Sequence, residues 1–225
     1  MKTESLIRSL DPSYCFRWEL YDGILKRLIN SETRWLDAGC GMNLAVQEFP
    51  CRLNIGLDAS FHPLMKNSPG IYFVQGNLEC IPFCDTTFSL VTLNTVVEHL
   101  ENPEPVFREI YRVLAPGGNL LIHTTNIHSP LILLGKALPQ GLRRFLFIRT
   151  FGAFEDDVFR TFHRVNTARS LKSIPGFEVE EFHAVQDINR HNKLVLGAFL
   201  CYHLSTRLPG MWRLRSNFIV LLRKR

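Results

Sequence analysis

Two aspartates at the ends of predicted strands are the residues with the clearest chemical potential in this chain. Asp37 is followed by a Gly39-Cys40-Gly41 turn, and Asp58 ends a second apolar run about 20 residues further on. A glycine turn lets the backbone approach a ligand that a side chain would block. An acid at the end of the second strand is commonly where a ribose is bound. The spacing therefore indicates a bound nucleoside.

The negative charge of Asp37 indicates which class of nucleoside could bind here. A carboxylate here would repel the pyrophosphate of a dinucleotide such as NAD, whereas it suits a ligand that carries an ammonium group. Ligands of open α/β sheets bind beyond the carboxyl ends of the strands. Asn77 and Asn94 follow two later predicted strands, so we expect them at the same edge of the sheet as Asp37 and Asp58.

Hydrophobic periodicity predicts the elements that position these residues. Phe16, Leu20, Ile24 and Leu28 recur at helical spacing and predict a helix over 14–29 that leads into the first strand. Strands are predicted at 34–36, 53–57, 70–75, 88–93, 119–124, 177–183 and 218–222, and further helices at 43–49, 104–114 and 167–174. The alternation predicts an α/β fold with a doubly wound parallel sheet, and a Pro-Gly-Gly turn at 116–118 before the fifth strand.

The length of 225 residues fits one domain with an appendage. We predict an N-terminal helical cap at 1–33, a cofactor-binding core at 34–126, and C-terminal strands and a helix at 176–225. Residues 127–175 interrupt the alternation and are predicted to form a helical insertion, or lid, on the substrate side. The leucines of 131–138 and the apolar run 142–148 are interpreted as packing residues, with a lipid or prenyl pocket as the alternative.

Five segments in this order resemble the class I S-adenosylmethionine-dependent methyltransferases, particularly the subgroup that includes ubiquinone and menaquinone biosynthesis methyltransferases. The segments are 36–41, 56–58, 76–83, 97–100 and 108–118, and the resemblance covers residues 34–126. Each motif alone is weak because a Gly-x-Gly turn is common, but five in the right order and spacing are specific. The resemblance implies a Rossmann-like, mostly parallel seven-stranded sheet and S-adenosylmethionine as the cofactor.

The resemblance also assigns roles within the chain. It implies that Asp37 and the glycine turn hold the methionine moiety, that Asp58 holds the ribose hydroxyls, and that Asn77 meets the adenine. The implied cofactor-binding residues are Asp37, Ala38, Gly39, Cys40, Gly41, Asp58, Ala59, Asn77, Leu78 and Asn94. No metal is implied.

Three positions depart from the family pattern. Asn43 stands where a third glycine is usual, Asn77 where aspartate is usual, and Ser89 where aspartate follows phenylalanine. Asparagine tolerates positive φ better than most residues, so Asn43 is compatible with the turn. The side-chain oxygen of Asn77 can still accept a hydrogen bond from an adenine amine, without the charge.

His99 is the candidate catalytic residue. Methyl transfer is an in-line displacement in which positioning supplies much of the acceleration, and a base is needed only when the acceptor is a hydroxyl or a protonated amine. Histidine has a suitable intrinsic pKa, and His99 follows the fourth predicted strand. A structural role, with the ring capping a helix or bonded to the backbone, is the equal alternative. His123, His128 and His163 are weaker candidates for the acceptor side.

Two other functional classes remain open from the sequence. One is a catalytically silent, methyltransferase-like scaffold that binds the nucleoside without turnover. The other is an NAD or nucleotide-sugar enzyme, which the absence of a third glycine and of a Tyr-x-x-x-Lys pair disfavours. The predicted reaction is methyl transfer to a small-molecule acceptor, lipid-like or phosphate-bearing, whose identity the residues do not specify.

The basic charge lies in the second half of the chain. Residues 1–126 hold ten basic and fourteen acidic residues, and residues 127–225 hold sixteen and seven. No aromatic-rich nucleic-acid motif accompanies them, so a solvated basic face is favoured over a nucleic-acid surface. Peripheral contact with an anionic membrane through the C-terminal part also fits, because 194–204 is apolar and is followed by Arg207, Arg213 and Arg215.

The six cysteines indicate a reducing compartment. They form no Cys-x-x-Cys pair and no alternation with histidine suited to zinc, which favours reduced thiols in a cytoplasmic protein. The N-terminus lacks the apolar segment of a signal peptide, and no run of about 18 apolar residues occurs.

Overall fold

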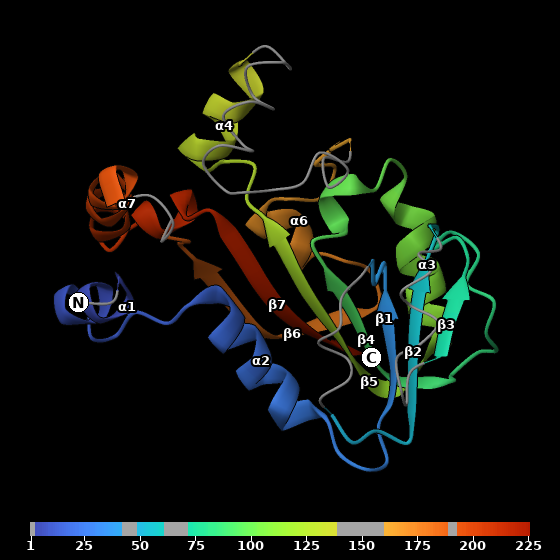
Figure 1. Cartoon of the computed structure of the whole chain (residues 1–225). Coiled ribbons are helices and arrows are strands. Elements are labelled where there is room, and N and C mark those ends of the chain that lie inside the picture. The colour runs from blue at the N-terminus through green and yellow to red at the C-terminus, as the bar shows by residue number, and fades with distance from the viewer. Residues whose placement is uncertain (1–2, 42–48, 61–71, 139–159, 189–192) are drawn as a thin grey trace.

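A computed structural model describes residues 3–41, 49–60, 72–138, 160–188 and 193–225. Seven strands form one sheet in the order β3-β2-β1-β4-β5-β7-β6 (Figure 1). The strands are β1 Arg34–Ala38, β2 Leu53–Asp58, β3 Tyr72–Gln75, β4 Phe88–Asn94, β5 Leu114–Thr125, β6 Phe177–Val185 and β7 Asn217–Lys224. The helices are α1 Thr3–Leu10, α2 Arg17–Leu28, α3 Pro103–Val113, α4 Pro130–Ala137, α6 Ala168–Lys172 and α7 Lys193–Ser205, with short 3₁₀ turns η3 Val97–His99 and η5 Met211–Leu214.

The predicted α/β fold with a mostly parallel seven-stranded sheet is confirmed. Strands β1 to β5 pair in parallel, and the order reverses between β1 and β4. Strand β7 is antiparallel to both of its neighbours, β5 and β6. The carboxyl ends of β1, β2 and β4 therefore meet at a topological switch point, where open α/β sheets bind ligands.

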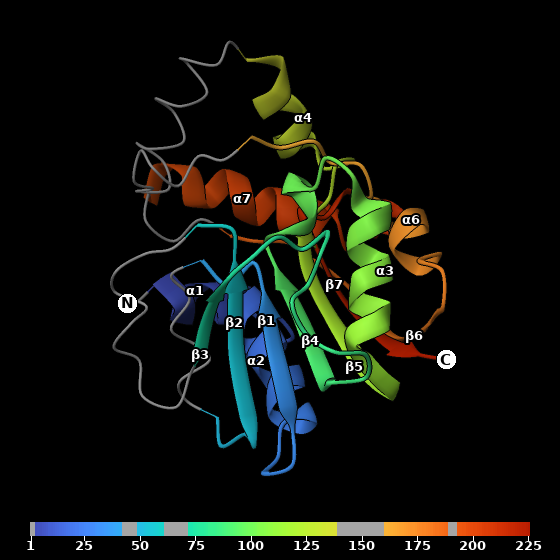
Figure 2. The ribbon, with the colours of Figure 1, turned by 90° about the vertical axis from the view of Figure 1, so that its right-hand side faces the viewer.

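Both faces of the sheet are buried, because successive side chains of a strand point to opposite faces and helices cover each face. Leu36 and Val91 point toward α3 and α6, whereas Trp35 and Leu90 point toward α2. Figure 2 shows α3 and α6 together on one side of the sheet and α2 on the other. Successive strand residues face opposite sides, so a strand covered by helices on both faces is an unbroken apolar run.

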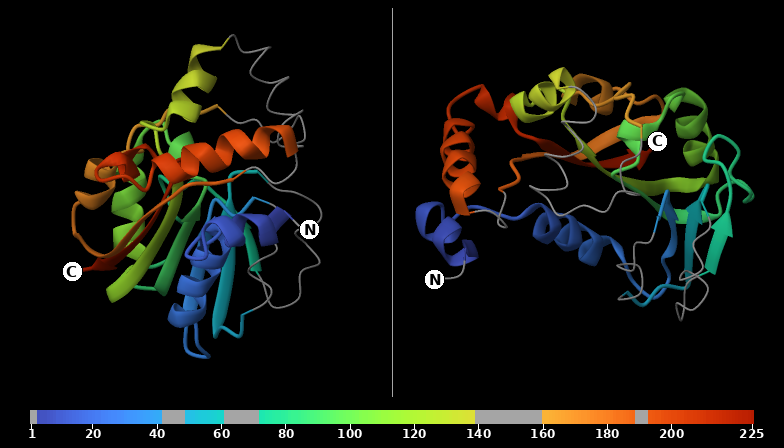
Figure 3. Two further views of the ribbon diagram at one scale, coloured as in Figure 1. Left: turned by 90° about the vertical axis from the view of Figure 1, so that its left-hand side faces the viewer. Right: turned by 45° about the horizontal axis from the view of Figure 1, so that its top comes forward.

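A third cluster joins the two ends of the chain. Ile7 from α1 and Leu196 and Leu200 from α7 are buried together with Tyr14 and Phe16. Figure 3 shows α1 and α7 side by side at one end of the sheet. The segment before α2 is thereby anchored to the segment after β6. No helix in the described parts of the chain is both long and apolar enough to cross a bilayer.

Two helices and one turn differ in detail from the sequence predictions, and two predicted segments fall mainly or wholly outside the described residues. In α2 the residues buried against the sheet are Tyr21, Ile24 and Leu25, whereas the predicted Leu20 and Leu28 are only half-buried. The predicted turn at 116–118 lies inside β5, which begins at Leu114 directly after α3 and has an irregular register there. The predicted helix at 43–49 and the apolar segment 142–148 fall mainly or wholly outside the described residues.

The leucines of α4 also differ from the sequence prediction. Leu131, Leu133 and Leu134 are 38%, 51% and 62% exposed, so their interpretation as packing residues is wrong. The apolar sequence predicted the helix correctly, but it carried no information about whether another element covers it.

Candidate cofactor site

The glycine turn after β1 is hydrogen-bonded to the end of β2. The backbone N–H groups of Gly39 and Cys40 donate to the carbonyl oxygen of Leu57, and the N–H of Gly41 donates to Oδ2 of Asp58 at 2.8 Å. Gly39 has φ +73°, and a Cβ there would lie 2.5 Å from Val96 Cγ2. Only glycine fits this position. It adopts the left-handed backbone without strain, and it has no Cβ that would overlap with Val96.

Asp37 is a buried carboxylate with one oxygen that lacks a partner. The hydroxyl of Thr92 donates to Oδ1 at 2.6 Å and in turn accepts from the indole N–H of Trp35 at 2.9 Å. Within the described residues Oδ2 has no hydrogen-bond partner, although the side chain is only 2% exposed. Burial raises the pKa of Asp37 to about 6, and the nearby charge of Asp58 adds to the rise while Thr92 opposes it.

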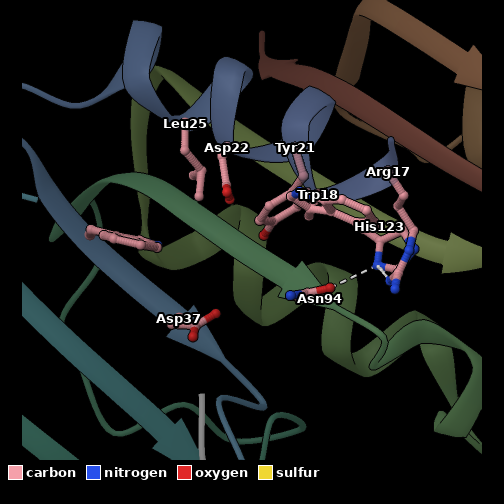
Figure 4. A pocket seen from close by; sticks show the side chains of 9 residues that line it. Arg17, Trp18, Tyr21, Asp22, Leu25, Asp37, Asn94 and His123 are labelled. Carbon is pink, nitrogen blue, oxygen red and sulfur yellow. Dashed lines mark hydrogen bonds between the residues drawn. The ribbon is translucent and has the colours of Figure 1, made fainter. Parts of the chain in front are cut away.

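A cavity of about 280 Å³ opens beside Asp37 (Figure 4). One wall is formed by residues of β1, β4 and β5, and the other by residues 17–25 of α2. Its lining residues are Arg17, Trp18, Tyr21, Asp22, Leu25, Trp35, Asp37, Asn94 and His123. The cavity therefore lies at the switch point, where the sheet order predicts a ligand.

His123 forms part of this wall as a neutral imidazole. Its Nδ1 lies 2.7 Å from Oδ1 of Asn94, which can only accept, so Nδ1 carries the proton. Its Nε2 then accepts from Nη1 of Arg17 at 3.2 Å. Burial and the positive charge of Arg17 lower the pKa of His123 to about 3. Arg17 is held from its other side by Asp187, with Nε 3.0 Å from Oδ2.

The ribose and adenine residues implied by the resemblance lie at the ends of β2 and β3. Asp58 is half-buried, and its Oδ1 accepts from the N–H of Ser60 at 2.8 Å, next to the exposed Ala59. Asn77 is exposed, and its Oδ1 accepts from the N–H of Glu79 at 2.9 Å, which closes a turn. A carboxylate or amide oxygen has more than one acceptor site, so these bonds leave both side chains able to meet a ligand.

The remaining implied residues also occupy the expected edge. Ala38 and Cys40 are buried, and burial raises the pKa of the Cys40 thiol to about 12. Leu78 is half-buried against the main core. Ser89, which departs from the family pattern, accepts from the N–H of Arg34 at 3.0 Å and ties the start of β1 to β4.

His99 does not line the cavity beside Asp37. It lies in η3, and its Nδ1 is 2.8 Å from the carbonyl oxygen of Arg160, so Nδ1–H donates to the backbone. This contact agrees with the structural alternative considered for His99 and does not test its catalytic role. Its neighbour Glu98 is buried and accepts from the hydroxyl of Thr124 at 2.7 Å.

The residues from α2 are the part of the site that the sequence prediction missed. Arg17, Trp18, Tyr21, Asp22 and Leu25 fall on one helical face, and four of the five are polar or aromatic. The prediction considered only the apolar period of this helix. A second face that combines Arg, Trp, Tyr and Asp at helical spacing was the available signal.

The fold, the glycine turn and the two strand-end aspartates are similar to those of class I S-adenosylmethionine-dependent methyltransferases. Residues 36–122 match the family model described as a methyltransferase domain. The matched region contains the glycine turn, Asp58, Asn94 and the end of α3, and it begins after α2.

Curated relatives match a short part of the chain, and solved structures share its fold. The chain is 40% identical over 68 residues to the mitochondrial 2-methoxy-6-polyprenyl-1,4-benzoquinol methylase of Dictyostelium discoideum, which is 30% of this chain and 22% of that protein. It is 40% identical over 52 residues to the ubiquinone/menaquinone biosynthesis C-methyltransferase UbiE of Klebsiella pneumoniae, 23% and 21% of the two chains. The chain thus matches about a fifth of the length of these relatives. An S-adenosylmethionine-dependent methyltransferase structure from Mesorhizobium loti shares the fold, with a TM-score of 0.58 at 17% identity over 92% of this chain and 97% of the other.

Proposed function

We propose that this protein transfers a methyl group from S-adenosylmethionine to a small, lipid-like acceptor. The observation that carries the proposal is Asp37 Oδ2, a buried carboxylate oxygen with no partner in the described residues, beside a cavity and a glycine turn. A buried carboxylate is stable only when something compensates its charge. A cofactor with an ammonium group and a sulfonium centre supplies that compensation.

The charges of the cavity wall also fit an amino acid moiety. Asp37 is available for an ammonium group, and Arg17 brings a guanidinium to the opposite wall from α2. Tyr21 lies between them, and burial raises the pKa of its hydroxyl well above the usual value, so it stays protonated. Asp58, whose Oδ2 accepts from the N–H of Gly41 in the glycine turn, would bind the ribose hydroxyls.

When bound, the cofactor would supply an electrophilic methyl group on a positively charged sulfur. The residues of this chain then have to position that group and keep water from it. The neutral His123 contributes to positioning, because its bonds to Asn94 and Arg17 fix side chains on both walls of the cavity. Trp18 is 38% exposed and lines the cavity, so it offers a flat apolar surface to an incoming acceptor.

The lipid-like acceptor rests on two observations. Two relatives matched over 68 and 52 residues are named for polyprenyl-benzoquinol and ubiquinone/menaquinone methylation. The described surface near the carboxyl ends of the strands also exposes several leucines. The basic second half of the chain would equally accommodate a phosphate on the acceptor.

Titration calorimetry with S-adenosylhomocysteine tests cofactor binding directly. We expect measurable heat and a dissociation constant in the micromolar range or below, and an increase in melting temperature with ligand concentration. Transfer is then followed with methyl-labelled S-adenosylmethionine and a host lipid extract. Binding without any labelled product would favour the silent scaffold, and stabilisation by NAD instead of S-adenosylhomocysteine would contradict the proposal.

His99→Ala separates the two roles considered for that residue. If His99 is the base, kcat falls by about 100-fold or more while the affinity for S-adenosylhomocysteine is unchanged. If His99 only bonds the Arg160 carbonyl, kcat is retained and the melting temperature falls. His99→Gln is the matched control, because an amide N–H can still donate to that carbonyl but cannot accept a proton at neutral pH.

A further inference from the structure

Within the described residues, an apolar helix with exposed leucines lies next to the cofactor end of the sheet. The first five residues of α4 are Pro130, Leu131, Ile132, Leu133 and Leu134, and the side chains of the three leucines are 38%, 51% and 62% exposed. Exposed large apolar side chains in such a group are unusual on a water-facing surface and mark an interaction site.

Two further exposed leucines lie at the end of α7 and just after it. Leu204, near the end of α7, is 42% exposed, and Leu208, just after that helix, is 60% exposed. The hydroxyl of Tyr202 in α7 donates to the carbonyl oxygen of Leu214, which ties the end of α7 to the loop that follows it. Figures 2 and 3 show α4 rising beside the C-terminal end of α7. We call Leu131, Leu133, Leu134, Leu204 and Leu208 the leucine rim.

The rim is tied firmly to the domain. The side-chain N–H₂ of Asn126 donates to the carbonyl oxygens of Arg213 and Arg215, both at 2.7 Å. The loop after α7 is therefore held against the segment that joins β5 to α4. A fixed apolar surface loses less conformational entropy on binding than a flexible one.

The segment that carries Leu204 and Leu208 is basic. Between residues 188 and 215 the sequence contains five Lys and Arg residues and no Asp or Glu. Arg207 and Arg213 are exposed and flank Leu208 along the chain. Arg207 also pairs with the buried Asp11, with Nη1 2.7 Å from Oδ1, while its side chain remains 48% exposed.

Apolar side chains set among cations are the combination that binds an anionic bilayer. The leucines enter the headgroup region and the cations meet the lipid phosphates. A second copy of this chain fits less well, because two faces of the same charge would repel each other.

We propose that the leucine rim docks the protein on the surface of an anionic lipid bilayer. The rim lies at the end of the sheet where β5 leaves His123 in the cavity wall and continues into α4. Docking there would bring the open end of the site toward membrane-dissolved molecules. The proposal concerns docking alone and does not depend on the proposed methyl transfer.

Vesicle co-sedimentation of the full chain without cofactor tests the proposal. We expect binding to vesicles containing phosphatidylglycerol, and at least tenfold weaker binding to pure phosphatidylcholine or in high salt. The double variant Leu133→Ser/Leu134→Ser should bind phosphatidylglycerol vesicles about 100-fold more weakly, because each inserted leucine contributes about a factor of ten.

Tyr72→Ser is the matched control. Tyr72 is 65% exposed on β3, at the other side of the sheet, so its replacement removes a large exposed side chain outside the rim. It should bind vesicles like the wild type, and both variants should keep the wild-type melting temperature. Failure of the wild type to bind anionic vesicles, or equal binding by the double variant, would overturn the proposal. So would a loss of self-association in the double variant without any vesicle binding.

Discussion

Replacing Asp37 with asparagine is expected to weaken S-adenosylhomocysteine binding by about 100-fold or more. The substitution keeps the shape and the bond from Thr92 but removes the charge of a carboxylate whose Oδ2 lacks a partner in the described residues. Removing one member of a buried, hydrogen-bonded charge pair costs about 2 to 5 kcal/mol. Calorimetry at pH 7.5 measures the change directly. An unchanged dissociation constant would remove Asp37 from the site.

The same variant is expected to be more stable than the wild type in the absence of ligand. The pKa of Asp37 is about 6 in the folded protein and near 3.8 when unfolded, so the folded state binds the proton more tightly. Stability therefore falls as pH rises from about 4 to 6 and stays reduced above 6, by roughly 3 kcal/mol at most. Asparagine carries no such penalty.

Urea unfolding at two pH values checks this expectation. At pH 7.5 Asp37→Asn should gain about 1 to 3 kcal/mol in free energy of unfolding, and the gain should shrink at pH 5. Glu101→Gln, at an exposed position before α3, is the control and should change stability little at either pH. Wild-type cofactor affinity should also decrease as pH falls below about 6, because Asp37 becomes protonated.

Gly39→Ala is expected to produce the largest loss of stability among single methyl additions in the site. The left-handed backbone at φ +73° costs an alanine about 1 to 2 kcal/mol, and the added Cβ would lie 2.5 Å from Val96 Cγ2. Relieving that overlap costs about 1 to 3 kcal/mol more. We expect the free energy of unfolding to fall by about 3 kcal/mol and cofactor binding to be lost.

Two comparisons separate the causes of that loss. Gly41 also has positive φ, at +51°, but a Cβ there would meet no atom within 4 Å, so Gly41→Ala should show the backbone cost alone. In Gly39→Ala/Val96→Ala the nearest remaining Val96 atom is Cβ, at 3.4 Å, an ordinary contact. The double variant should regain part of the stability. If Gly39→Ala is no worse than Gly41→Ala, the Val96 contact does not restrict the turn.

The strand ends were predictable because their signals are local. An apolar run that ends in an acid and a glycine turn defines both the strand and its direction in a parallel sheet, so Asp37 and Asp58 could be placed at one edge. The antiparallel direction of β7 has no such signal. An apolar run of that kind pairs equally well either way, and the path through α7 decides the direction.

The cavity wall was less predictable because it depends on long-range contacts. His123 is neutral and buried only because Asn94 and Arg17, from β4 and α2, converge on its ring. No spacing in the sequence reveals that convergence. In the same way, the composition of α4 predicted a helix but not its exposure, because exposure depends on what the rest of the chain leaves uncovered.

The position of α2 matters for comparing this chain with its relatives. The family match begins at residue 36, yet five of the nine cavity-lining residues come from 17–25. More than half of the residues that line the cavity are thus encoded upstream of the matched region, where substitutions leave its motifs intact. We expect that exchanging this single upstream helix would change what the cavity binds while the strand-end motifs stay as they are.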